Sequence, residues 1–214
     1  MPGHEQPWLP EPPAGTAVCG GFDGSENHDW TAIKLETRSG LIFTPRYGPD
    51  RRPTVWNPAE WGGRIPRSEV HAAWSELADR FDLRRVYCDP GFRDESSWAT
   101  DIEQWDEQHG PEKFIPWVMA GSRRYGAVFA ALRRFEADLD SGFISHDGCP
   151  ITTTHMGNAR KSAKAGDLYI LMKPSQHQKI DGAVTSVLTH EAASDERAAG
   201  WPETTGPTYF RLPR

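Results

Sequence analysis

Hydrophobic and polar positions alternate along the first part of the chain. A short apolar run over residues 16–22 ends at the turn sequence Asp23-Gly24-Ser25, and residues 31–36 then alternate between apolar and polar side chains. A period of two is typical of a half-buried strand. A Ser-Gly pair precedes a further apolar run at 41–44, which indicates another chain reversal. The pattern therefore predicts three antiparallel strands.

The rest of the chain switches between helix and strand patterns. Apolar residues recur every three or four positions in helices and run together in buried strands. This spacing predicts helices over residues 70–81, 97–108, 125–139, 149–158 and 180–188. Short apolar runs predict strands over residues 85–89, 113–118 and 168–171. Together these elements predict an α/β fold whose sheet is covered by helices.

Prolines gather near both ends of the chain. The first fifteen residues contain Pro2, Pro7, Pro10, Pro12 and Pro13, a composition typical of an extended, flexible linker. The last residues are also proline-rich and predict a mobile tail. A length of 214 residues fits one domain. We therefore expect one folded domain over residues 16–195, between a linker (1–15) and a tail (196–214).

Charge and cysteine content limit the possible classes of function. The formal net charge of −6 argues against a simple nucleic-acid binder, which normally carries a basic excess. The three cysteines, Cys19, Cys88 and Cys149, are widely spaced and fit neither a disulfide framework nor a zinc site. The sequence contains no apolar run long enough for a membrane span and no apolar signal core, so we expect a soluble, unsecreted protein.

Three aspartates fall where predicted elements begin or end. Asp23 follows the first strand, Asp89 ends the fourth, and Asp181 opens the last helix. If the strands are neighbours, these carboxylates meet, and like charges in one place imply a bound cation. Oxygen ligands favour Mg²⁺ or Mn²⁺, and two such ions would support hydrolysis of a phosphodiester. A lone acid at a strand end is more often a cap or a solvated turn.

Three stretches around these aspartates resemble the acidic motifs of phage large terminase nuclease domains. They are residues 21–26 (GFDGSE), 87–91 (YCDPG) and 178–184 (QKIDGAV), and the resemblance covers about residues 17–193. It implies a ribonuclease H-like fold, with three antiparallel strands followed by parallel strands in a mixed central sheet. It also implies that Asp23, Asp89 and Asp181 bind the catalytic metals, with Asp29 as a further candidate. Residues 154–159 resemble another family segment, without an assigned role.

The resemblance implies a metal-dependent endonuclease that uses two Mg²⁺ or Mn²⁺ ions to cut double-stranded DNA during phage genome packaging. The implied partners are DNA, the terminase ATPase domain, the portal and the small terminase subunit, in the cytoplasm of the infected host. No GxxxxGK[ST] phosphate loop occurs in the chain, so the ATPase is not part of this sequence. Whether the chain is an excised domain or a separate gene product stays open.

Several basic residues are candidates for contacts to DNA phosphates. The candidates are Lys179, two residues before Asp181, and the pairs Arg123-Arg124 and Arg160-Lys161. An ordinary charged surface explains each of them equally well. Two other functions also remain open: a Holliday-junction resolvase, which would share the acids but prefer branched DNA, and a non-catalytic module that docks on DNA or the portal.

Overall fold

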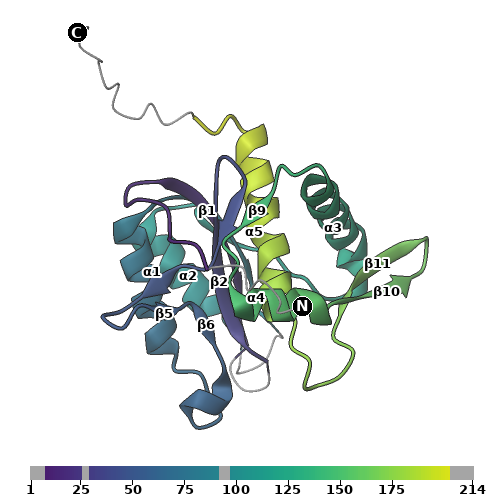
Figure 1. Cartoon of the computed structure of the whole chain (residues 1–214), viewed down its shortest axis with the longest axis horizontal. Helices are drawn as coiled ribbons and strands as arrows, with labels where there is room; N and C mark the ends of the chain where they lie inside the picture. The colour runs from purple at the N-terminus through teal and green to yellow at the C-terminus, as the bar shows by residue number, and fades with distance from the viewer. Residues whose placement is uncertain (1–7, 26–28, 92–96, 203–214) are drawn as a thin grey trace, which may run out of the picture.

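A mixed sheet forms the centre of the molecule (Figure 1). The computed structural model describes residues 8–25, 29–91 and 97–202. The sheet has the strand order β8-β7-β1-β2-β3-β9, with β6 also paired to β2. Its strands are β1 (Ala17–Asp23), β2 (Thr31–Thr37), β3 (Leu41–Phe43), β6 (Val55–Trp56), β7 (Asp82–Asp89), β8 (Phe114–Pro116) and β9 (Ser145–His146).

The strand directions confirm the predicted fold class. Strands β1, β2 and β3 form an antiparallel meander, and β7 and β8 continue the sheet parallel to β1. The segment that follows β3 contains several short elements: β4 (Arg46–Tyr47), β5 (Arg52–Pro53), β6 and the 3-10 helix η1 (Pro58–Trp61). No helix in the described part of the chain has the length and apolar character needed to cross a bilayer.

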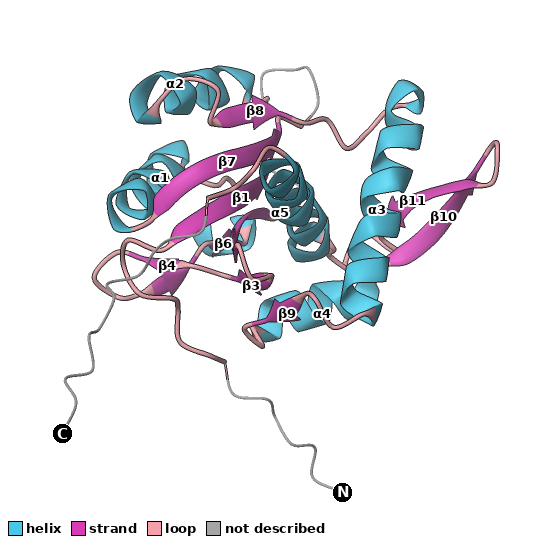
Figure 2. Ribbon diagram, turned by 90° about the horizontal axis from the view of Figure 1, so that it is seen from above, coloured by secondary structure: helices cyan, strands magenta, loops and turns pink. Residues whose placement is uncertain are grey.

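Helices cover both faces of the sheet (Figure 2). On one face lie α1 (Arg67–Arg80) and α2 (Ala99–His109), which bury Trp74 and Trp105 against Phe22, Ile33 and Leu35 of the sheet. On the other face lies α5 (Asp181–Ala198), flanked by α3 (Tyr125–Asp140) and α4 (Pro150–Asn158). The tryptophans of this core explain how a chain of only 37% hydrophobic residues packs a large interior.

Helix α5 packs unusually close to β1. A Cβ atom built on Gly21 would lie 2.5 Å from Thr189 Oγ1 and 2.6 Å from the Thr189 backbone nitrogen. Only glycine permits this approach of a helix to a strand. The close packing fixes the start of α5 beside the end of β1, and this juxtaposition places Asp181 near Asp23.

One predicted strand does not join the central sheet. Residues 168–171 form part of β11 (Leu168–Met172), which pairs only with β10 (Arg160–Lys164), a strand that the sequence pattern did not predict. The two strands form a separate hairpin beside α3 (Figure 2). Both strands are largely exposed or half-buried, so their apolar side chains pack on α3 rather than in the sheet.

The two ends of the chain differ from the expected linker and tail. The backbone of Leu9 and the indole of Trp8 both donate hydrogen bonds to Asp147, and Glu11 forms ion pairs with Arg51 and Arg80. Residues 8–15 therefore lie against the body and are not a free linker. At the other end, α5 continues to Ala198 and Trp201 is buried, so the tail begins later than residue 196. Residues 1–7 and 203–214 lie outside the described residues.

Candidate active site

Two of the predicted site residues are direct neighbours across the sheet. Asp23 ends β1 and Asp89 ends β7, and the two residues are paired in the parallel register. Pro90 stops β7 directly after Asp89, because proline has no N–H to donate to a ladder. One carboxylate oxygen of Asp89 accepts the Gly91 backbone N–H at 3.1 Å, and the other accepts that of Met119 at 3.2 Å. These bonds hold the Asp89 carboxylate at the strand tip.

Asp181 reaches the same place from the other face of the sheet. It is the first residue of α5, and its side chain is buried. Among the described residues the Oδ2 atom has no hydrogen-bond partner, which is rare for a buried carboxylate oxygen. An unpartnered buried oxygen is costly unless a cation or water satisfies it. Its position at the N-terminus of a helix partly offsets this cost through the helix dipole.

All three aspartates line one cavity of about 510 Å³. The walls also include the loop after β8 and the end of the β10–β11 hairpin, and the charged lining residues are Asp23, Asp29, Asp89, Lys173 and Asp181. Across the described ranges, no three His, Cys, Asp or Glu side chains are placed closely enough to hold a metal ion together. The carboxylates thus share a cavity without forming a closed ligand cage.

Burial raises the pKa of all three carboxyl groups, and repulsion from neighbouring acids adds to the effect at Asp23 and Asp181. Burial raises the pKa of Asp23 well above its usual value, and the charges of Asp181 and Asp89 raise it further. Burial, followed by the charge of Asp29, raises the pKa of Asp181 to about 6. Burial also raises the pKa of Asp89, although its two backbone hydrogen bonds oppose the shift. The cluster therefore resists full ionisation when no cation is present.

Asp29 has a different environment from the other three acids. Lys173 Nζ lies 2.6 Å from both of its carboxylate oxygens, and Lys179 Nζ lies 2.7 Å from Oδ1. Burial pushes the pKa of Asp29 upward, but these two ammonium groups outweigh it and hold the pKa below its usual range. Asp29 is thus an ionised carboxylate engaged by two lysines.

Helix α4 supports the backbone on both sides of Asp181. The Asn158 side chain donates to the Lys179 carbonyl at 2.9 Å, and the Gly182 backbone N–H donates to His155 Nδ1 at 3.0 Å. His155 is buried, and burial lowers its pKa to about 4, so its imidazole is neutral. These contacts give a structural role to residues 154–159, which had none from the sequence.

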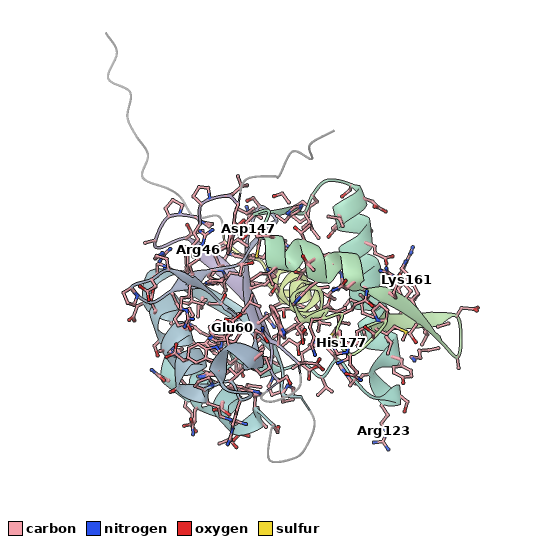
Figure 3. All side chains as sticks on the ribbon, turned by 60° about the horizontal axis from the view of Figure 1, so that its bottom comes forward. Arg46, Glu60, Arg123, Asp147, Lys161 and His177 are labelled. Atoms are coloured by element: carbon pink, nitrogen blue, oxygen red, sulfur yellow. The ribbon has the colours of Figure 1, made fainter. Side chains whose placement is uncertain are left out.

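The basic residues predicted to contact DNA occupy different surroundings. Arg123 is exposed and extends away from the body in Figure 3. Arg124 donates to the Val118 carbonyl and lies over the Trp117 ring, close to the cavity wall. Lys161 pairs with Glu136, and Arg160 donates to backbone carbonyls of Gly157 and Ala159. Lys179 forms an ion pair with Asp29 of the cavity, and the charge of Arg124 opposes the rise that burial causes in the pKa of Asp89.

Several solved structures have this arrangement of sheet and helices. The large terminase nuclease of the thermophilic phage G20c with bound magnesium superposes with a TM-score of 0.56 at 15% identity, covering 82% of this chain and 81% of that one. The HK97 bacteriophage large terminase gives a TM-score of 0.63 at 16% identity, covering 87% of this chain and 41% of that one. The fold is that of a large terminase nuclease domain. The predicted fold is therefore confirmed.

Two curated phage proteins are similar to this chain in sequence. The Gene 13 proteins of Mycobacterium phages D29 and L5 are each 28% identical over 193 residues, which is 85% of this chain. The chain spans only 30% of the length of these curated relatives. No protein-family model matches the chain.

Sequence patterns did not identify two residues that the terminase nuclease fold brings to the site. Lys173 follows β11, and the isolated lysine gave no signal because its partner, Asp29, lies 144 positions away in the chain. His155 lies in the stretch whose role was unassigned, and its bond to Gly182 joins positions 27 residues apart. A local pattern carries no information about either pairing.

Proposed function

We propose that the chain is the nuclease domain of a phage large terminase and cuts double-stranded DNA with divalent metal ions during genome packaging. The observation that carries this proposal is the meeting of Asp23, Asp89 and Asp181 in one cavity, from two adjacent strand ends and one helix start. Three converging carboxylates in a cleft are the donor set of a metal-dependent phosphodiester hydrolase.

The donor chemistry fits Mg²⁺ or Mn²⁺. The three residues offer only oxygen atoms, and Asp181 Oδ2 is buried with no other partner among the described residues. The residues that would hold the ions are Asp23, Asp89 and Asp181, which line the same cavity. Bound ions would supply an activated water and offset the charge that develops on the phosphate.

The partners follow from the same proposal. Duplex DNA is the substrate, and Arg123, Arg124, Arg160, Lys161 and Lys179 are the candidate phosphate contacts. The terminase ATPase domain, the portal and the small terminase subunit would complete the packaging complex in the cytoplasm of the infected host. The net charge of −6 suggests that these partners contribute much of the DNA affinity.

Nicking of supercoiled plasmid tests the proposal. The wild-type chain is incubated with Mg²⁺, Mn²⁺ or a chelator and compared with Asp89→Asn. We expect metal-dependent nicking and linearisation by the wild type, and a loss of at least about 100-fold in the variant, because an amide cannot replace a charged metal ligand. Asp140→Asn, at the exposed end of α3, is the matched control and should cut at the wild-type rate.

The alternatives predict different results. Strong preference for a four-way junction over linear duplex would favour a resolvase. Failure of the folded wild type to cut with any metal, together with retained binding to DNA or portal, would favour a docking module. Equal cutting by wild type and Asp89→Asn would contradict a nuclease centred on this cluster.

A further inference from the structure

Asp29 and two lysines form a charged group at the edge of the candidate active site. Lys173 Nζ contacts both carboxylate oxygens of Asp29, and Lys179 Nζ contacts one of them. The two lysines come from different elements: Lys173 follows the β10–β11 hairpin, and Lys179 precedes α5. Their side chains remain 25% and 17% exposed, and Lys173 lines the cavity, so a ligand bound there can reach Lys173 directly.

The charges around the cavity explain why this group forms. Asp23, Asp89 and Asp181 add negative charge beside Asp29, and Lys173 stabilises the ionised forms of both Asp23 and Asp181. The two ammonium groups carry two positive charges, whereas the Asp29 carboxylate carries one negative charge. The excess positive charge therefore acts on the other acids, as a bound cation would.

Asp29 also has the wrong partners for a metal ligand. Each of its oxygens already accepts a charge-assisted hydrogen bond from a lysine at 2.6–2.7 Å. An ion would have to displace two ammonium groups in order to reach it. Asp181 Oδ2, by contrast, is buried and accepts no hydrogen bond from the residues that the structure describes. Metal ions are therefore expected to be held by Asp23, Asp89 and Asp181 rather than by Asp29.

We propose that Lys173 and Lys179 are exchangeable counter-ions: Asp29 holds both ammonium groups beside the carboxylates, and on DNA binding they transfer to the oxygens of the phosphate being cut. The proposal rests on the nuclease function argued above and assigns Asp29 as a positioning residue. Divalent ions and the two lysines then compete for the negative charge of the same cavity. Lys173 becomes a catalytic residue once it contacts the phosphate.

Because of this competition, Lys173→Met should raise the affinity for Mn²⁺ and lower the rate of DNA cleavage. Removing one ammonium group should tighten Mn²⁺ binding about three- to tenfold, because a nearby positive charge no longer repels the ion. DNA cleavage at saturating Mn²⁺ should fall by at least about tenfold, because the phosphate loses a cationic partner. Mn²⁺ affinity is measured calorimetrically without DNA, and cleavage is measured on linear duplex.

Two further variants, measured in the same way, show whether the effects of Lys173→Met come from the lost positive charge or from a structural change. Lys173→Arg keeps the positive charge and should restore the wild-type Mn²⁺ affinity and part of the cleavage. Lys113→Met, before β8 and outside the cavity lining, is the matched control and should change neither quantity. A thermal melt of each variant checks that it is folded.

Each outcome decides between the proposals. Tighter Mn²⁺ binding with slower cleavage in Lys173→Met supports the counter-ion exchange. Weaker Mn²⁺ binding, or cleavage at the wild-type rate, in the folded variant overturns it, while the nuclease function stands if the wild type still binds Mn²⁺ and cuts. A wild type that neither binds Mn²⁺ nor cuts overturns both.

Discussion

The Gly182 backbone N–H donates to Nδ1 of His155 at 3.0 Å, so the residue after Asp181 is fixed to α4. The Trp30 ring packs edge-on against the same imidazole, with centroids 5.0 Å apart. A Cβ on Gly182 would lie 3.2 Å from Nδ1, so the helix start and the histidine are in close contact. The orientation of Asp181 therefore depends on a histidine of another helix.

Substitutions of His155 distinguish its contribution to core packing from its contribution to the position of Asp181. His155→Ala should lower the free energy of unfolding by about 2–3 kcal/mol, because it leaves a cavity and an unsatisfied N–H. His155→Phe should recover part of this loss by filling the space, but not the cleavage rate, which should stay about 10- to 100-fold below wild type because Asp181 shifts. Denaturant melts and plasmid nicking measure the two quantities.

His177→Ala is the control for this prediction. His177 is exposed in the segment between β11 and α5 (Figure 3), so its loss should change neither stability nor cleavage. Full activity in a folded His155→Phe protein would show that the Gly182 contact does not position Asp181.

The raised pKa of Asp181 predicts a pH-dependent stability of the metal-free protein. A carboxyl group whose pKa is higher when folded than when unfolded binds more protons in the folded state, so stability falls as pH rises between the two values. For Asp181 this window runs from its ordinary value of 3.8 to about 6. Asp181→Asn should therefore raise the metal-free stability at pH 7.5 by on the order of 1–2 kcal/mol.

Thermal melts at pH 4.5 and pH 7.5, with and without Mg²⁺, test this stability prediction. Mg²⁺ should raise the melting temperature of the wild type at pH 7.5 more than at pH 4.5, because protons and metal ions compete for the carboxylates. It should have a much smaller effect on Asp181→Asn. An equal response of both proteins to Mg²⁺ would place the ion elsewhere.

The sequence predicted the elements that carry the three aspartates better than it predicted their surroundings. The turn and the proline that end their strands mark Asp23 and Asp89. The start of the apolar positions of α5 marks Asp181. These are local signals. The strand 168–171 was assigned correctly as an element, but its place outside the sheet depends on pairing with β10, whose residues are mostly polar and exposed.

The charged environment of the site could not be predicted in the same way. The pairing of Asp29 with Lys173 and Lys179 joins segments about 150 residues apart, and the proximity of α5 to β1 depends on a single glycine. Proline content predicted a free linker over residues 1–15, but Trp8 and Glu11 make specific polar contacts to the body. Composition does not reveal such contacts.

Arg123 provides a test of the DNA-binding surface. Its side chain is exposed and directed away from the body (Figure 3), so Arg123→Ala should leave stability unchanged. If it contacts a phosphate, duplex affinity should fall about three- to tenfold for every sequence, and the salt dependence should weaken by about one unit of slope. Arg133→Ala, which loses a surface pair with Glu136, is the control. Equal affinity and slope in both variants would exclude Arg123 from the surface.

Two glycine substitutions test whether the approach of α5 to β1 builds the site. Gly21→Ala forces a methyl group to within 2.6 Å of the Thr189 backbone nitrogen, which cannot rotate away, so we expect a loss of about 2–4 kcal/mol in unfolding free energy. Because α5 must move from β1, Asp181 also moves from Asp23, and cleavage by the folded fraction should fall at least tenfold. Gly126→Ala, in α3 with nothing within 4 Å, should instead stabilise by about 0.5–1 kcal/mol. Denaturant melts and nicking assays measure both variants. If Gly21→Ala were as stable and as active as Gly126→Ala, the close packing of α5 on β1 would not build the site.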